Sequence, residues 1–394
     1  MRKLILILVA LLALVNSSCE RRELVELSNT HYVRVYINED IQNVTSGLHE
    51  NIQTPPKYKS PQILRLLLAD PQTGKVRAER FLRTKSSDER GTYYEGYIVA
   101  DPGNYRLIAY NFDTEVCIVR NYTDFNNSMV YTNEIATHLK TKISKAARRV
   151  IQKEMQREMQ KVAQKSKALS TRADDDRGED RIVYAPDIFF LANYENVYVP
   201  YSDVLDTLKT RDKDFFTAES LVETYYLEIP VKGIELATSS VGLVSGMAGS
   251  AWLGTASINE YDPVALYLEL QPGGDNEAGV VRAKGETDAE GEEKSTAVMY
   301  TTFNTFGKLP DMDSRLTITF DFLTVHGGSY TAAVDITPEF LDAHQNGTRH
   351  ITVGEDKLID IEVVEPGPGG GSAGGGGFKP TVGTWEDVQT EIIM

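Results

Sequence analysis

Apolar and polar positions alternate with a period of two at several places along the chain, as in strands with one face in a core. In the first part of the chain, strand-like stretches lie at residues 32–37, 63–68, 92–99, 105–111 and 115–119. In the second part, they lie at residues 183–194, 223–236, 316–322 and 359–363. Turn-forming residues separate them, for example Asp101-Pro102-Gly103-Asn104. The pattern predicts an all-β chain built from β-sandwiches.

The period changes to about four between residues 132 and 172. The apolar positions there are Ile135, Leu139, Ile143, Ala147, Ile151, Met155 and Met159. Strong helix formers fill the gaps without Gly or Pro, so this stretch is predicted to be helical. It carries eleven Lys and Arg against three Glu. Such a helix could meet an anionic surface, but its thin face of Ala and Met favours a solvated helix held by a narrow stripe.

This segment divides the chain in the predicted domain organisation. An N-terminal β-sandwich is expected over residues 31–131, followed by a basic helical segment and linker over 132–182. A C-terminal β-sandwich is expected over residues 183–365. Within it, the glycine-dotted stretch 242–254 lacks the Lys-Ser/Thr ending of a phosphate-binding loop. We therefore interpret this stretch as a turn or bulge inside the sandwich.

The first eighteen residues have the pattern of a secretory signal. Arg2 and Lys3 precede a run of twelve apolar residues, 4–15, which is too short to cross a bilayer core of about 30 Å. Small residues then lead to Cys19. A signal that ends in small residues and cysteine resembles those of bacterial lipoproteins, in which the cysteine is lipidated and becomes the new first residue. We therefore expect a signal over 1–18, a lipid on Cys19 and a polar tether over 19–30.

Composition narrows the classes of partner. The 394 residues carry a net charge of −16, and removal of Arg2 and Lys3 with the signal lowers it to −18. An acidic chain argues against nucleic acid as a partner.

Besides Cys19, the sequence has one cysteine, Cys117, which β-branched residues flank on both sides. This pattern favours a buried side chain in a strand over a reactive nucleophile, since no activating partner stands at a recognisable spacing.

Candidate chemistry for an enzyme is weak throughout the sequence. No two histidines have the spacing of metal ligands; His344 and His350, six residues apart, are interpreted as surface positions. The acidic run Asp174–Asp176 with Glu179 and Asp180 could attract calcium, but it lacks the EF-hand spacing, so we interpret it as solvated. We predict no catalytic residue, no metal site and no cofactor. The six histidines are His31, His49, His138, His326, His344 and His350.

The C-terminal end combines a glycine-rich segment with an apolar tail. Residues 366–377 are nearly all Gly, Pro and Ser and are predicted to be a linker. The tail 378–394 contains Trp385, Val388, Ile392 and Ile393. A tail of this kind can add as a strand to the edge of its own sheet or of a neighbour's sheet.

Several short motifs in a fixed order together resemble the fimbrillin-like lipoproteins of the Bacteroidetes. They are the lipoprotein start, Pro102-Gly103-Asn104-Tyr105, Tyr184-Ala185-Pro186-Asp187, Ser245-Gly246-Met247-Ala248-Gly249-Ser250 and the glycine-rich linker before Trp385. The resemblance implies two transthyretin-like β-sandwich domains and a role in pilus structure. It implies that shaft subunits lose their first strand by proteolysis after an Arg and receive a strand from a neighbouring subunit. The basic helical segment is longer than the family suggests.

The sequence therefore predicts a non-enzymatic, palmitate-bearing lipoprotein of the outer membrane, acting as a structural, anchor or adhesive subunit of fimbriae. Its expected partners are the membrane, through the lipid, and other pilus subunits, through strand addition. A glycan-binding surface lipoprotein is the alternative, because exposed aromatic side chains could stack on sugars. Aromatic residues clustered on one exposed loop would favour glycan binding, and a strand-shaped groove would favour the pilus.

Overall fold

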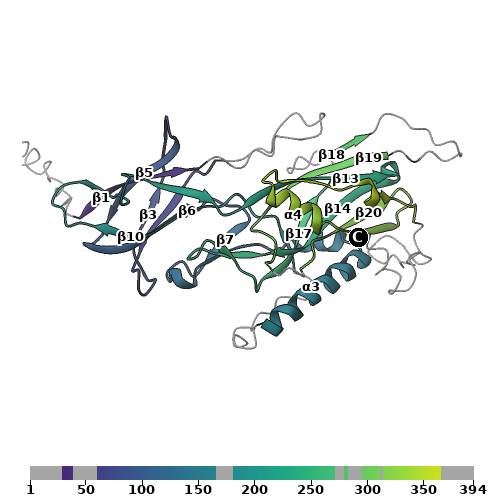
Figure 1. The fold of residues 1–394 in the computed structure, drawn as a ribbon, viewed down its shortest axis with the longest axis horizontal. Helices are drawn as coiled ribbons and strands as arrows, with labels where there is room; N and C mark the ends of the chain where they lie inside the picture. Colours follow the sequence, from purple (N-terminus) through teal and green to yellow (C-terminus); the bar gives the residue numbers. More distant parts are fainter. Residues whose placement is uncertain are drawn as a thin grey trace, which may run out of the picture.

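The computed structural model describes residues 29–38, 60–165, 181–270, 279–282, 294, 296–310 and 314–364. The predicted signal, Cys19, most of the tether, the acidic run 174–180, the linker 366–377 and the tail 378–394 lie outside these residues. The described chain consists mostly of β-strands in several sheets with few helices (Figure 1). This agrees with the predicted all-β class.

A nine-stranded sheet forms the end of the molecule at the left of Figure 1. Its strands, in spatial order, are β3 (Val76–Leu82), β2 (Leu64–Ala69), β6 (Gly103–Asn111), β10 (Phe190–Val199), β12 (Phe216–Ser220), β1 (Thr30–Ile37), β5 (Gly91–Val99) and β4 (Thr84–Asp88). The short strand β11 (Asp206–Thr207) also pairs with β1. Alternate residues such as Val35, Leu66 and Leu107 are fully buried in one core, so this sheet folds over itself as a sandwich.

Pairing in this sheet crosses the boundary predicted at residues 182/183. β10 pairs with β6 from Leu191↔Tyr110 to Val199↔Gly103, and β12 pairs with β1 from Val35↔Phe216. β10 and β12, which lie within residues 190–220, therefore belong to the same sheet as the strands from the first part of the chain. The helical pattern between residues 132 and 172 marks a change of local structure, whereas membership of the sheet depends on long-range pairing that no local pattern records.

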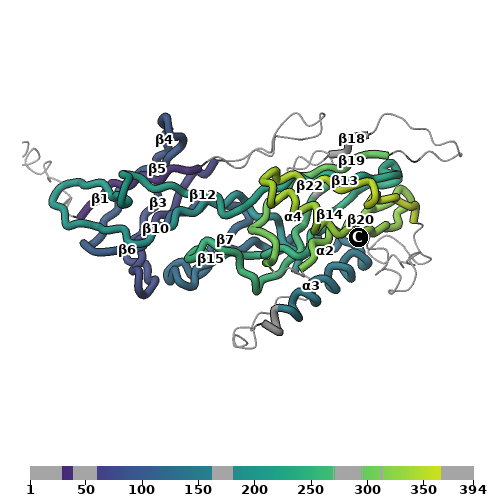
Figure 2. The backbone as a smooth tube through the Cα atoms, viewed as in Figure 1, coloured from purple at the N-terminus to yellow at the C-terminus, as the bar shows by residue number. Residues whose placement is uncertain are grey.

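A small four-stranded sheet lies next to the nine-stranded sheet. It contains β7 (Cys117–Arg120), β8 (Met129–Thr132), β15 (Ser250–Trp252) and β16 (Ser257–Ile258), with the 3-10 turn η1 (Phe125–Asn127) between β7 and β8. Its apolar side chains, including Phe125 and Leu253, share a core with Tyr110 and Phe189 of the larger sheet. This sheet joins the two ends of the molecule (Figure 2).

Two five-stranded sheets enclose the core at the other end. One contains β18 (Gly279–Arg282), β19 (Thr296–Thr305), β13 (Glu223–Lys232), β22 (His350–Thr352) and β23 (Ile359–Asp360). The other contains β21 (Ser329–Asp335), β20 (Thr317–Thr324), β14 (Ala237–Ala248), β17 (Pro263–Glu269) and β9 (Ile182–Tyr184). The helix α4 (Thr337–Gln345) and the 3-10 turns η2 (Ile234–Leu236) and η3 (Glu355–Lys357) connect their strands. Side chains such as Leu227, Leu266 and Phe320 form the common core.

The predicted bulge in 242–254 is confirmed. The pairing of β14 with β17 shifts register between Ser245 and Met247, and Gly246 between them has φ +91°. A Cβ atom on Gly246 would lie 2.2 Å from the carbonyl oxygen of Arg315. Both the left-handed backbone and this close approach require glycine.

Two helices form from the segment with a period of four: α2 (Thr137–Lys142) and α3 (Lys145–Lys165). α3 lies along the outer face of the sheet that contains β14 and β17 (Figure 1). Ile143, Ala147, Ile151 and Met155 are buried there, whereas Met159 is exposed. The predicted apolar stripe therefore holds the helix to the protein over most of its length.

Candidate functional site

β1 is the first strand of the chain and the strand that would be exchanged in a strand-exchange mechanism. On one edge it pairs antiparallel with β5 from Thr30↔Val99 to Tyr36↔Tyr93. On the other edge it pairs in parallel with β11 and β12. Val33 and Val35 point into the core and are fully buried. β1 is thus held by two ladders and by its apolar face, and its loss would open a strand-shaped groove between β5 and β12.

The outward face of β1 carries aromatic and charged side chains in contact with β5. The guanidinium carbon of Arg34 lies 4.7 Å from the centre of the Tyr93 ring. The Tyr36 ring packs against Tyr93 in a tilted arrangement, with 5.0 Å between the ring centres, and the Tyr36 hydroxyl donates a hydrogen bond of 2.5 Å to Asp88. Burial and this carboxylate raise the pKa of Tyr36. The Tyr36 hydroxyl therefore stays protonated and clamps β1 to the β4–β5 turn.

His31, the second residue of β1, has an unusual environment. Its side chain is fully buried, and neither ring nitrogen has a hydrogen-bond partner. Burial lowers the pKa of His31 below its ordinary value of 6.5, although nearby Asp206 opposes the shift. This histidine is therefore neutral at pH 7, and its burial without a polar partner agrees with a packing role.

Exposed apolar and aromatic side chains gather where β1 begins, at the tip of the N-terminal sandwich. We call this group the tip cluster; it consists of Tyr97, Val99, Tyr198, Tyr201, Val204 and Leu205. Two hydrogen bonds hold its parts together: the Asn29 amide donates to the Ser202 carbonyl at 2.9 Å, and the Ala100 amide donates to the Asn29 carbonyl at 3.1 Å. The tip cluster was missed in the sequence because its members come from β5, β10 and the loop after β10.

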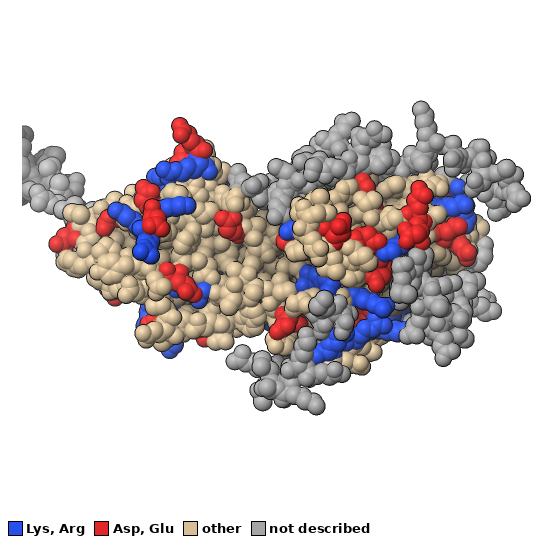
Figure 3. All heavy atoms as spheres, viewed as in Figure 1, with Lys and Arg blue, Asp and Glu red and all other residues tan. Residues whose placement is uncertain are grey.

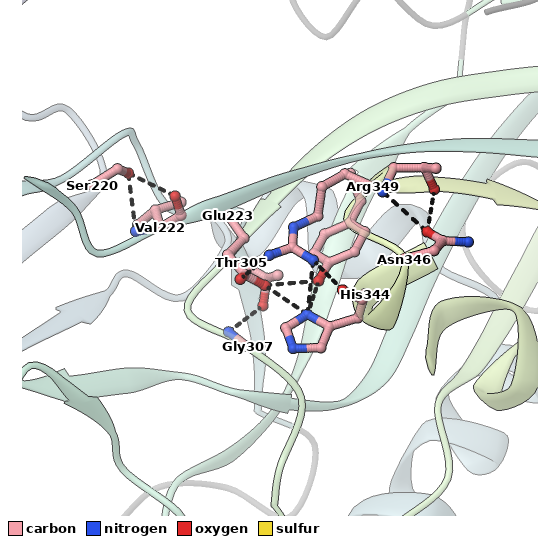
Figure 4. A network of polar contacts seen from close by, with 10 residues as sticks. Ser220, Val222, Glu223, Thr305, Gly307, His344, Asn346 and Arg349 are labelled. Carbon is pink, nitrogen blue, oxygen red and sulfur yellow. Dashed lines mark hydrogen bonds and ion pairs between the residues drawn. The ribbon is translucent and has the colours of Figure 1, made fainter. Parts of the chain in front are cut away.

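A polar network joins β13 to the turn between α4 and β22 (Figure 4). Arg349 Nη2 lies 2.7 Å from Glu223 Oε1, and Tyr225 donates a hydrogen bond of 2.7 Å to Glu223 Oε2. His344 Nδ1 lies 3.0 Å from Arg349 Nη1. Burial, followed by Glu223, raises the pKa of Tyr225 far above its ordinary value. Since Glu223 is paired with Arg349 and the Tyr225 phenol stays protonated, the geometry supports a structural junction between β13 and the α4–β22 turn.

His344 and His350 take part in separate contacts, as their spacing suggested. His344 is about half exposed within the network, but the prediction of a surface position is wrong for His350. Its side chain is only 12% exposed, and its Nε2 lies 3.3 Å from Glu228. β22 covers it by pairing in parallel with β13, a long-range contact that the local sequence does not reveal.

Cys117 is buried at the start of β7, as predicted. Burial, with a smaller contribution from Asp187, raises its pKa well above the usual thiol range.

Among the described residues, no three His, Cys, Asp or Glu side chains are grouped so that they could hold a metal ion. None of the helices described has the length and apolar character needed to cross a membrane. Lys and Arg side chains gather at the position of α3 in Figure 3, and the helix contributes Lys145, Arg148, Arg149, Lys153 and Arg157.

Comparison with known protein families gives a match over more than half of the chain. The model of a family described as "Domain of unknown function (DUF5119)" matches residues 18–269. No curated protein matches the chain.

Similar solved structures come from fimbrial and adhesion proteins. A candidate adhesin from Bacteroides ovatus has a TM-score of 0.49 at 16% identity, covering 88% of this chain and 98% of its own. The fimbrial anchor protein Mfa2 from Porphyromonas gingivalis has a TM-score of 0.38 at 10% identity, covering 82% of this chain and 88% of its own. A fimbrial assembly protein from Parabacteroides distasonis has a TM-score of 0.28 at 12% identity, covering 78% of this chain and 85% of its own. The kinds of protein found agree with the fimbrillin-like resemblance, but likenesses this distant carry no functional argument.

Proposed function

The chain belongs to the family described as "Domain of unknown function (DUF5119)", and from this premise we propose that it is a non-enzymatic fimbrial subunit of the anchor type. In this proposal a lipid on Cys19 attaches the chain to the outer membrane, at the cell surface or at the base of fimbriae. The two ends of the molecule are two transthyretin-like sandwiches, and α2 and α3 are a helical insertion.

The observation that supports the anchor role is the absence of an arginine between β1 and β2. In the fimbrillin-like scheme, shaft subunits lose their first strand by a cut after an Arg. Here the sequence has no arginine between Arg34, inside β1, and Arg65, inside β2. An Arg-specific protease therefore has no site at which it could release β1 as a whole. A subunit that keeps its first strand, and that is not cut after Arg21 or Arg22 in front of it, also keeps a lipid on Cys19.

In the same proposal, contact with the next pilus subunit uses strand addition. The tail 378–394 is the candidate donor strand, since it follows a glycine-rich linker and carries Trp385, Val388, Ile392 and Ile393. An anchor that donates its tail and keeps its own groove filled by β1 would form one end of a fibre.

The test compares wild type with Cys19→Ala in cells that assemble the fibre. We expect the variant to leave the membrane fraction, because two acyl chains supply most of the membrane affinity of such a protein. Fimbriae should then appear in the medium instead of on cells. A Cys19→Ala protein that still sediments with membranes after a high-salt wash would overturn the proposal.

Glycan binding is a second candidate because three tyrosines of the tip cluster, Tyr97, Tyr198 and Tyr201, are at least half exposed. Tyrosine rings of this kind can stack on sugars. Their neighbours Val99, Val204 and Leu205 are aliphatic, however, and supply no hydrogen bonds to hydroxyl groups. A glycan array with the Tyr201→Ala variant as control would distinguish specific sugar binding from its absence.

A further inference from the structure

The most exposed large hydrophobic side chains of the described residues all belong to the tip cluster. They are Val204 (69% exposed), Val99 (66%), Tyr201 (65%) and Tyr198 (61%). Side chains of this size are costly to keep in water when several lie together, and such groups mark contact surfaces. The tip cluster is therefore a candidate contact surface.

The distribution of these side chains around the tip indicates the shape of the partner. Tyr97 and Val99 lie on the outer side of β5, since Ile98 between them is buried. Tyr198 lies on the outer side of β10, between buried Val197 and Val199. Because β5 and β10 belong to opposite halves of the folded sheet, the apolar residues surround the tip instead of forming one flat patch. A layer into which the whole tip dips matches this arrangement better than a second folded protein.

The start of the chain lies at the same tip. Asn29 precedes β1 and is hydrogen-bonded to Ser202 and Ala100, on both sides of the tip cluster. Only residues 20–28 separate Asn29 from Cys19. Ten steps of extended chain reach about 35 Å at most, so a lipid on Cys19 would keep the tip within this distance of the bilayer.

We propose that the tip cluster is a second membrane contact, which inserts into the interface of the bilayer that holds the Cys19 lipid; this rests on the proposed function. Tyrosine rings favour the headgroup level, and the valine and leucine side chains favour the acyl boundary just below it. The long axis of the molecule then stands away from the membrane, with the β13 and β20 sheets farthest from it (Figure 2).

The charge of the tip determines the kind of lipid surface. Residues 97–104 and 196–206 contain no Lys or Arg, but they do contain Asp101, Asp203 and Asp206. The contact is therefore apolar and does not depend on anionic headgroups. Zwitterionic lipid should suffice, and added anionic lipid should not strengthen insertion.

The test places one environment-sensitive fluorophore on the lipidated protein. Val204→Cys carries it at the tip, and Val325→Cys carries it at the opposite end, where Val325 follows β20 beside the start of β14 and is 49% exposed. Buried Cys117 should not react in the folded protein, and the labelled wild type supplies the blank. The labelled proteins are bound to phosphatidylcholine vesicles with and without nitroxide-bearing lipid.

We expect a blue shift and at least twofold quenching by the nitroxide lipid at position 204, with neither change at position 325. If the protein floats with the vesicles but the label at 204 stays as aqueous as the label at 325, lipid anchoring stands and the tip contact is refuted. If the protein does not float with the vesicles, the proposed lipid anchor itself fails. A blue shift at 204 that follows protein concentration without vesicles would indicate self-association and would also refute the tip contact.

Discussion

Ile151→Ala tests whether α3 is a docked part of the fold or a solvated insertion. Ile151 is fully buried in a cluster with Leu243, Ala265 and Tyr267. Truncation of a buried Ile to Ala costs about 2–5 kcal/mol. Since α3 lies at the outer face of its sheet, water can fill part of the space, and we expect the lower part of this range, about 2–3 kcal/mol.

Hydrogen exchange of the α3 amides measures this loss directly. If the helix opens as a local unit, a loss of about 2–3 kcal/mol speeds exchange about 30- to 150-fold. The matched control is Met159→Ala on the same helix, which is 48% exposed and should change stability by no more than about 0.5 kcal/mol. Equal exchange rates in the two variants would refute the docking of α3.

Four shorter predictions follow from other parts of the structure. Gly246→Ala should destabilise the fold in urea titration by about 2 kcal/mol or more, because its Cβ would meet a backbone oxygen, whereas Gly347→Ala has open space and should cost less. His31 has a lowered pKa, so the unfolded chain binds the extra proton first; stability should fall as pH drops below 6.5, and His31→Gln should flatten this slope. Asp321 has a raised pKa because of burial, so the folded state keeps the proton longer; stability should fall as pH rises from about 4, and Asp321→Asn should lack that fall. Cys117 should react with a thiol reagent only after unfolding, and reaction in native buffer at the rate of a free thiol would contradict its burial.

Local patterns in the sequence predicted the class of fold and many of its elements. Alternation identified β1 around Val33 and Val35, and the period of four identified the buried stripe of α3. The glycine-dotted stretch was correctly interpreted as a bulge, because a run of small residues inside strand-like sequence favours left-handed backbone. These features depend on residues close together in the chain, so local sequence patterns are enough to predict them.

Features that depend on distant pairing could not be predicted in the same way. The sequence gives no local sign that 190–199 pairs with β6 instead of joining the C-terminal strands. His350 looked exposed because the residues around it are turn formers, yet parallel pairing with β13 covers it. The tip cluster likewise combines residues about a hundred positions apart, so only the folded chain brings Tyr97 near Tyr201 and the start of β1.

The central claim is that the mature chain keeps β1 and is attached through Cys19. Mass spectrometry of the protein purified from the membrane fraction of the cells that make it tests this claim most directly. The account predicts one N-terminal peptide that begins at an acylated Cys19, with residues 30–37 still joined to the rest of the chain. A mature terminus beyond Ile37, with the first strand absent, would contradict it.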